Sequence, residues 1–436
     1  MPYKTRYHEE ISGKNAFKHV EALCAFGPRH AATPNEHKAI EYIKNEFDSY
    51  KNLKTELEKT GPIVDWRQVD ARLQIVSPIE LELTCRAILG TGSTPEEGIR
   101  CELAYGGRGF RKDYEGQDLK NKIVLHDPPH ALTLDNACAP GMPQRDLNYL
   151  NSLGVSGLIE YCRTPGKLIS APLLSGREGM DTPCVSLTYD DAIYLKQLLT
   201  QWYALPMGLI ATERIPIILW MKTITERKPG SSYNVIATLP GRELPEEKVI
   251  LLAHHDNAYG PGAVDNAASL AVVLEVAKAL DTINPNNKRS IEFVTVSGEE
   301  YGQAGSGDYV ANRLSSIDNV KGVIVLDICG GGDKYFYVEK SMWDGELVYN
   351  SKKINKMLEE TCDGLGLDIQ PTPLEFASDD APFIKAGVET SYICRLISMS
   401  WPWLHTDLDT PRIVDIAALK VLSEMSINTL MRLANE

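Results

Sequence analysis

The sequence predicts an α/β fold: a mixed, largely parallel sheet flanked by helices, with an inserted β-rich domain. Three apolar runs, residues 249–253, 291–296 and 323–326, have the length and composition of buried strands, and helix-length segments separate them. Strands that alternate with helices in this way pair in parallel. From about residue 67 to residue 222 the pattern changes to short strand-like segments broken by Gly and Pro, which indicates a second domain.

The domain organisation follows from these changes in pattern. A chain of 436 residues exceeds one simple core, which favours two domains. We expect residues 1–66 and 223–436 to form the main domain and residues 67–222 to be inserted into it. Apolar residues spaced three or four apart predict two helices between residues 10 and 50, and a helix that packs on the sheet over residues 413–433.

Composition excludes several classes of partner. The net charge of -14 argues against nucleic acid and against an anionic membrane surface. Nine scattered cysteines with no CxxC pair indicate neither a disulfide framework nor a thiolate zinc site, so we expect reduced thiols. No signal peptide or membrane-spanning run is present, which favours a cytoplasmic protein, although a secreted mature form would look similar. A homo-oligomer stays open.

Polar side chains follow each of the three predicted strands. The first strand ends at His254, the second is followed by Glu299 and Glu300, and the third runs into Asp327. Asp265 opens the helical pattern after the first strand. Because the carboxyl ends of parallel strands meet at one edge of a sheet, we expect these side chains to converge there. So many acids at one buried edge are costly unless they hold a cation, which predicts a metal site.

Each of these residues also has a simpler interpretation. His254 alone would more often be a structural histidine, and Asp265 alone would most often cap a helix. Glu299 and Glu300 would usually be a solvated pair, and Asp327 could be a turn residue. Solvated faces and caps do not predict acids at successive strand ends, so the combination favours the metal site.

A second histidine ligand is available in residues 401–411, a segment with two tryptophans and two prolines. It carries His405, which is the one histidine after His255 in the sequence. Alone, it would be a surface loop histidine. Together with His254, two histidines and three carboxylates suit two zinc ions about 3.5–4 Å apart that share one carboxylate.

At this point the sequence resembles a known family, the di-zinc exopeptidases related to leucyl aminopeptidases, glutamate carboxypeptidase and the transferrin receptor. The similar segments span about residues 230 to 436, and the inserted region resembles a protease-associated domain more loosely. The segments that carry the two resemblances are residues 253–256, 261–266, 297–302, 305–306, 326–327, 378–383 and 405–406 for the peptidase, and residues 120–125, 154–159 and the strand after Pro183 for the inserted domain.

The resemblance implies a role for each site residue. His254 and Asp327 would hold one Zn²⁺, Glu300 and His405 the other, and Asp265 would bridge them. Asp256 would hydrogen-bond to His254 and fix its tautomer. Glu299 would be the general base. It would take a proton from a water between the ions, which leaves a hydroxide, and would pass that proton to the leaving amine. Co²⁺ or Mn²⁺ stays open as the native metal.

Several positions depart from the family pattern, Ala268 and Ser269 among them, and two of the departures bear on the site. His255 stands where a tyrosine is common, and it could compete with His254 as a nitrogen ligand. Leu404 stands where several relatives place a tyrosine that polarises the carbonyl of the substrate. Which group, if any, polarises the carbonyl in this protein is left open.

The implied function is an aminopeptidase that releases N-terminal residues from peptides, since spare carboxylate near the metals would attract an α-ammonium group. Trp401, Trp403 and Phe383 could line its side-chain pocket, or belong to the core. A carboxypeptidase or dipeptidase on the same scaffold would need a cation for the substrate carboxylate, and Arg395 is the candidate. A glutaminyl cyclase would keep one zinc, which five ligands disfavour. A non-catalytic binding protein has no use for Glu299 as a base.

Overall fold

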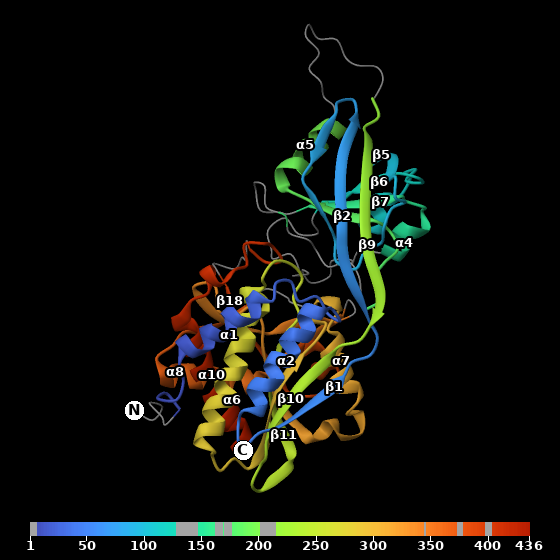
Figure 1. Ribbon diagram of the computed structural model, residues 1–436. Coiled ribbons are helices and arrows are strands. Elements are labelled where there is room, and N and C mark those ends of the chain that lie inside the picture. The colour runs from blue at the N-terminus through green and yellow to red at the C-terminus, as the bar shows by residue number, and fades with distance from the viewer. Residues whose placement is uncertain are drawn as a thin grey trace. The chain divides into compact units, whose positions relative to one another are not determined.

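The computed structural model describes residues 7–127, 147–161, 169, 177–200, 215–343, 346–372, 378–396 and 403–436. The chain forms two compact units (Figure 1). The first contains Met1–Asp65 and Pro229–Glu436, and the second contains Trp66–Asp135 and Met142–Lys228. The boundaries fall within two long strands, β2 (Ile63–Ser77) and β9 (Ile218–Gly230). The boundary after Asp65 lies one residue from the expected boundary at 66, and the boundary after Lys228 lies six residues from the expected boundary at 222.

The first unit is built on a mixed sheet. Among the described residues it has eight strands, in the order β1-β10-β12-β11-β13-β18-β14-β17. Their bounds are β1 (Lys54–Lys59), β10 (Tyr233–Leu239), β11 (Leu244–His254), β12 (Arg289–Val296), β13 (Val320–Leu326), β14 (Lys334–Val338), β17 (Ile369–Thr372) and β18 (Thr390–Leu396). A separate hairpin pairs β15 (Lys340–Trp343) with β16 (Glu346–Tyr349).

Four neighbouring strands at the centre of this sheet, β12, β11, β13 and β18, are all parallel. Leu251 lies opposite Phe293 on one side and Ile324 on the other, and all three side chains are fully buried. This confirms the predicted parallel core. The outer strands add antiparallel pairs, since β10 runs against β12 and β14 against β18. The carboxyl ends of the four central strands therefore meet at one edge.

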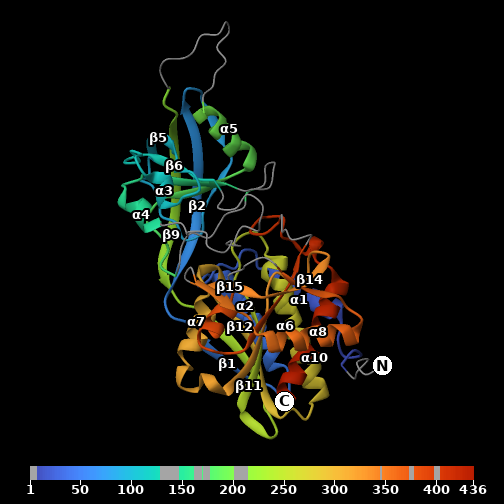
Figure 2. The same cartoon turned by 180° about the vertical axis from the view of Figure 1, so that it is seen from behind.

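Helices cover the sheet in two groups. In the first group, α1, α6 and α10 pack on one another, and α6 and α10 also pack on β11. In the same group, α2 packs on β10 and α8 packs on α10. Figure 1 shows α2 and α6 in front of the sheet. In the second, α7 and α9 pack together and contact β10 and β13 respectively, and Figure 2 gives the view from behind. Their bounds are α1 (Gly13–Ala25), α2 (Pro34–Asp48), α6 (Ala268–Ile283), α7 (Ala304–Ala311), α8 (Lys352–Leu365), α9 (Asp380–Lys385) and α10 (Ile416–Asn435).

Local sequence explains where these helices begin. The hydroxyls of Ser12, Thr33 and Ser351 each accept a backbone N–H in the first turn of α1, α2 and α8, and the Asp415 carboxylate does the same for α10. One predicted start is different. Asp265 and Asn266 do not open α6. They lie in a wide turn, η1 (Ala263–Ala267), with non-helical backbone angles, and their peptide bond is cis.

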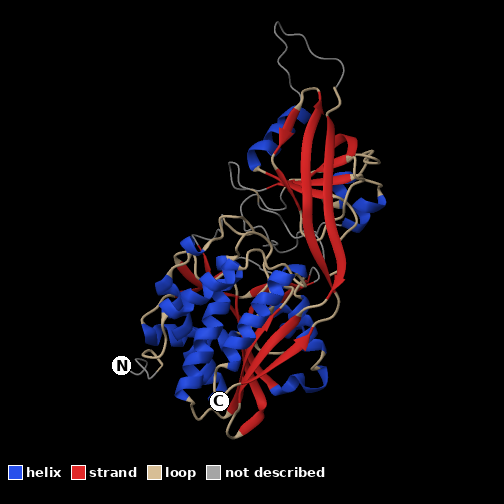
Figure 3. Ribbon diagram, in the orientation of Figure 1, coloured by secondary structure: helices blue, strands red, loops and turns tan. Residues whose placement is uncertain are grey.

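The second unit is β-rich, as Figure 3 shows by colour. Its described strands form an eight-stranded sheet in the order β3-β2-β9-β5-β6-β7-β8-β4, around a core that includes Leu103, Ile123, Ile159 and Val185. The remaining bounds are β3 (Leu81–Leu83), β4 (Cys85–Ala87), β5 (Ile99–Tyr105), β6 (Ile123–Leu125), β7 (Gly157–Tyr161), β8 (Cys184–Leu187), α3 (Arg111–Tyr114), α4 (Leu147–Ser152) and α5 (Tyr189–Thr200).

Two findings concern the described chain as a whole. Its cysteines, seven in the ranges given above, are all free thiols. Within the same ranges, none of the helices combines the length and the apolar character that crossing a membrane requires.

Candidate active site

The predicted ligands come from the carboxyl ends of the four central strands. His254 is the last residue of β11, Glu300 lies in the short turn η2 (Glu299–Tyr301) after β12, and Asp327 directly follows β13. His405 comes after β18, and Asp265 lies in η1 between β11 and α6. All five residues are at most 6% exposed, so the fold brings them together at a buried edge.

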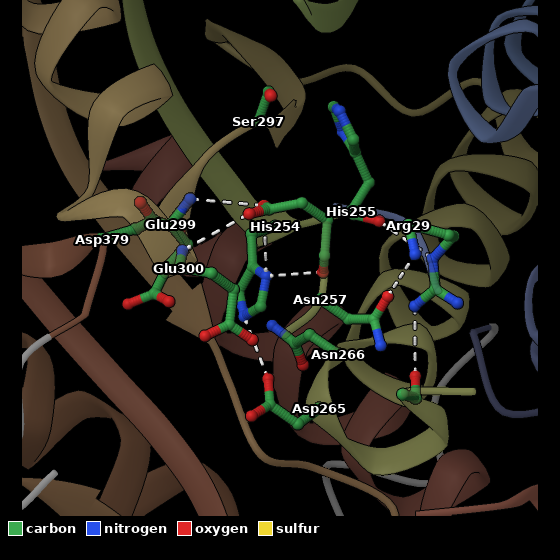
Figure 4. Close-up of polar contacts among 12 residues, drawn as sticks. Arg29, His254, His255, Asn257, Asp265, Asn266, Ser297, Glu299, Glu300 and Asp379 are labelled. Carbon is green, nitrogen blue, oxygen red and sulfur yellow. Dashed lines mark hydrogen bonds and ion pairs between the residues drawn. The ribbon is translucent and has the colours of Figure 1, made fainter. Parts of the chain in front are cut away.

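The five side chains form two groups that share Asp265. His254, Asp265 and Asp327 form one, and Asp265, Glu300 and His405 form the other; within each, the potential ligand atoms lie within 4.8 Å of one another. Asp265 turns one oxygen to each histidine. Its Oδ1 lies 3.3 Å from His254 Nε2 (Figure 4). Its Oδ2 lies 3.1 Å from His405 Nε2. A carboxylate placed in this way can bridge two cations.

The donor set fits zinc. Ligand atoms at the usual 2.0–2.1 Å from a tetrahedral zinc ion lie about 3.3 Å from each other. His254 Nε2 lies 3.3 Å from Asp327 Oδ1, and His405 Nε2 lies 3.2 Å from Glu300 Oε2. That Glu300 oxygen is buried and has no hydrogen-bond partner among the described residues, although it faces the imidazole. A buried oxygen that faces an imidazole nitrogen in this way is suitably placed to share an ion with it.

The remaining carboxylate oxygens of the ligands are held by hydrogen bonds. Asp327 Oδ2 accepts from the Ser378 hydroxyl at 2.7 Å and from the Tyr392 hydroxyl at 3.4 Å. Glu300 Oε1 accepts the backbone N–H of Ala258 at 2.9 Å. Because these bonds occupy one oxygen of each carboxylate, they leave the other directed at a histidine. Groups that orient ligands in this way raise metal affinity.

Asp256 links two parts of the site. Its carboxylate accepts the backbone N–H groups of Glu299 and Glu300 at 3.2 and 3.3 Å, which fastens the η2 turn to β11 (Figure 4). His254 Nδ1 lies 3.1 Å from the Asp256 backbone carbonyl and 3.5 Å from its carboxylate. The carbonyl therefore gives the closer contact. An Nδ1–H donated there leaves Nε2 free to bind a metal.

Glu299 is buried among other carboxylates. Burial raises its pKa; His254 opposes this, while Glu300, Asp327 and Asp379 raise it further, so that the pKa of Glu299 lies well above its ordinary value. Its side chain lies beside the ligands but belongs to neither ligand group among the described residues. An acid with this position and a raised pKa can hold and release a proton.

Asp409 joins the loop of His405 to the loop of Asp265. Its carboxylate accepts the backbone N–H groups of Val264 and Asp265 at 2.8 and 3.0 Å, and its carbonyl accepts that of Ala263 at 3.2 Å. Burial raises the pKa of Asp409 to about 7. The predictions assigned no role to Asp409, although it stands only four residues after His405.

Arg29 holds the loops on the other side of the site. It is fully buried, and its guanidinium donates to the carbonyls of His255 at 3.0 Å, Pro261 at 2.7 Å and Gly262 at 3.2 Å (Figure 4). Its backbone N–H donates to Asn257 Oδ1 at 2.6 Å. The sequence analysis assigned no role to Arg29, because nothing in a Gly-Pro segment indicates a buried arginine.

We expect Arg29→Met to destabilise the fold by about 3 kcal/mol or more, because several buried carbonyls lose their donors together. Urea unfolding measures the loss, with the exposed Arg412→Met as the matched control. A loss of less than about 1 kcal/mol would show that water replaces the guanidinium and that Arg29 does not hold these loops.

Three sequence-based alternatives can now be compared with the structure. His255 is not a competing ligand: Nδ1 lies 3.2 Å from the Thr295 hydroxyl, and Nε2 lies 3.3 Å from Glu36. Successive residues of a strand point to opposite sides, so His255 turns away from the side that His254 faces (Figure 4). Phe383 is fully buried against Tyr309 and belongs to the core. Trp401 lies outside the described residues.

Comparisons with known proteins show which enzymes the chain and its fold are similar to. Over 422 residues the chain is 25% identical to aminopeptidase YwaD of Bacillus subtilis, covering 92% of this chain and 80% of that one. It is 22% identical over 329 residues to carboxypeptidase Q of Xenopus laevis, covering 73% and 66%. The fold is similar to the structure of BSAP, described as a zinc aminopeptidase from Bacillus subtilis, with a TM-score of 0.72, 20% identity and coverage of 98% and 96%.

A family model matches the part of the chain that carries the site. The model of peptidase family M28 covers residues 234–430, from β10 to α10. This range contains the four central strands and all five predicted ligands. Over this range the chain is similar to peptidase family M28, and its fold is similar to that of BSAP over nearly the whole chain.

Proposed function

We propose that this protein is a zinc-dependent aminopeptidase that removes N-terminal residues from peptides at a centre for two metal ions. One observation carries the proposal: Asp265 directs one carboxylate oxygen to each of two buried histidines, with a further carboxylate beside each histidine. A single-ion site has no need of this sharing.

The ligand assignment follows from the two groups. His254 and Asp327 would hold one zinc ion, Glu300 and His405 the second, and Asp265 both. When bound, the ions would supply Lewis-acid chemistry, by lowering the pKa of a bound water and polarising the scissile carbonyl. Asp256, Ser378 and Asp409 orient the ligands or the loops that carry them.

Glu299 would move the proton. Its carboxylate takes a proton from the attacking water and returns it to the nitrogen of the leaving amine, which completes the exchange without a net change in the enzyme. The buried position of Glu299 keeps bulk water from competing for that proton. The carboxylates around it make the site acidic, and an acidic site favours a substrate that presents an α-ammonium group.

A carboxypeptidase is the second candidate, and the likeness to carboxypeptidase Q favours it. The cation proposed from the sequence is Arg395. In the structure its guanidinium donates to the Gly331 carbonyl and the Asp415 carboxylate, both at 3.0 Å, and the residue is 7% exposed. Arg395 is therefore engaged within the fold, which leaves the aminopeptidase as the better supported activity. A non-catalytic binding protein gives no reason for Glu299 in this position.

We also propose that the second unit is a protease-associated-like domain. The three segments that suggested this resemblance contribute β6, β7 and β8, which pair in parallel with one another in that order. The expected substrates are peptides with a free N-terminus, with no nucleic acid or membrane involved.

The test is a series of short peptides with free, N-acetylated and C-amidated ends, incubated with and without a chelator. We expect chelator-sensitive cleavage that acetylation abolishes and amidation leaves intact. Loss of cleavage on amidation alone would establish a carboxypeptidase instead. Protein with two zinc ions bound that cleaves none of the peptides would contradict the proposed function.

A further inference from the structure

The amide of Gln303 contacts the proposed general base. Gln303 lies directly before α7, and its Nε2 donates a hydrogen bond to Glu299 Oε1 at 3.2 Å. Among the described residues, this is the one side chain that hydrogen-bonds to the Glu299 carboxylate. No sequence motif pointed to it, since a glutamine at a helix start is ordinarily a surface residue.

The backbone of Gln303 has an unusual conformation. Its φ of 54° and ψ of 41° lie in the left-handed region, which residues with a β-carbon rarely adopt. The conformation is held on both sides, because its N–H donates to the Glu299 carbonyl at 2.9 Å and its carbonyl accepts the Gly307 N–H at 2.9 Å. Strain of this kind is concentrated at functional sites, where the side chain has a use.

The surroundings of Glu299 explain that use. The Glu299 carboxylate is buried beside the predicted ligands, and the Gln303 amide gives it a hydrogen bond that holds one of its two oxygens. An N–H donor suits both protonation states, because the carbonyl oxygen of the protonated acid still accepts a hydrogen bond. A cationic side chain there would hold the base ionised and hinder its uptake of a proton. A neutral amide orients the carboxylate without that effect.

We propose that Gln303 is a positioning residue for Glu299, an inference that rests on the proposed function. Gln303 holds Oε1 and fixes the orientation of the carboxylate. Oε2 is left as the oxygen that receives the proton from the attacking water and gives it to the leaving amine. Gln303 is partly exposed while Glu299 is only 8% exposed, so the amide also separates the base from solvent.

Two variants test this role. Gln303→Gly removes the amide and adopts the left-handed conformation without strain, so its fold is at least as stable as that of the wild type. Gln303→Met keeps the length of the side chain without a donor. The control is Gln370→Met on β17, because Gln370 Nε2 also donates to a carboxylate, that of Asp368 at 2.9 Å, on an exposed edge of the sheet.

We expect both Gln303 variants to lower kcat by about 5- to 30-fold, with KM changed by less than about threefold and zinc content unchanged. Gln370→Met matches the wild type.

The outcomes separate this role from the proposed function. A wild type that cleaves peptides while both Gln303 variants keep its kcat would overturn the role of Gln303 alone. A rise in KM without a fall in kcat would also overturn it, because Gln303 would then bind substrate. A wild type that holds zinc but cleaves no peptide would overturn the proposed function, and the role of Gln303 with it.

Discussion

Glu299→Gln lowers kcat by about 10²- to 10⁴-fold, which is the range that a lost general base gives. The substitution keeps the shape of the side chain and leaves all five predicted ligands in place. Zinc content and the melting temperature should therefore stay close to those of the wild type. Loss of rate without loss of metal is the result that distinguishes a base from a ligand.

The measurement combines steady-state kinetics on one free-ended peptide with metal analysis of the same sample. Glu21→Gln, an exposed position on α1, is the matched control. Near wild-type turnover in Glu299→Gln would show that another group takes the proton. Loss of zinc together with activity would instead make Glu299 a ligand.

Asp265→Ala has the second large effect, and here metal and stability are lost together. Each oxygen of Asp265 faces a different histidine, so its removal weakens both ion sites at once. A bound metal stabilises the folded state according to its affinity and concentration. The wild type should therefore melt at a higher temperature with zinc than with chelator, and this difference should almost disappear in Asp265→Ala.

Thermal unfolding with zinc and with chelator provides the comparison, and the exposed Asp318→Ala serves as the control. A variant that still binds two zinc ions and keeps the full zinc-dependent rise in melting temperature would show that Asp265 does not bridge.

The sequence predicts those site residues well that lie at the ends of strands. His254 and Asp327 stand directly at the ends of apolar runs that are buried between neighbouring strands, so both their position and their convergence follow from the parallel order of β11 and β13. His405 was proposed because no other histidine follows His255, and the structure brings it to the same edge after β18. The parallel core of the sheet is confirmed, whereas the ligand roles stay predictions.

Loops account for what the sequence did not predict. Arg29, Asp409 and Gln303 act through backbone groups or through single contacts with segments far along the chain or across a turn. Neither periodicity nor spacing reports such contacts, because they depend on how each loop closes. Asp265 is an intermediate case: the residue was found, but the wide turn before α6 replaces the expected helix start.

The central claim is that five side chains form one centre for two ions, with Asp265 shared. Chelator-treated protein titrated with zinc, with peptide cleavage measured at each addition, tests it most directly. We predict two ions bound per chain, with full activity only as the second site fills. Full activity at one ion per chain, or binding that saturates at one, would contradict the account.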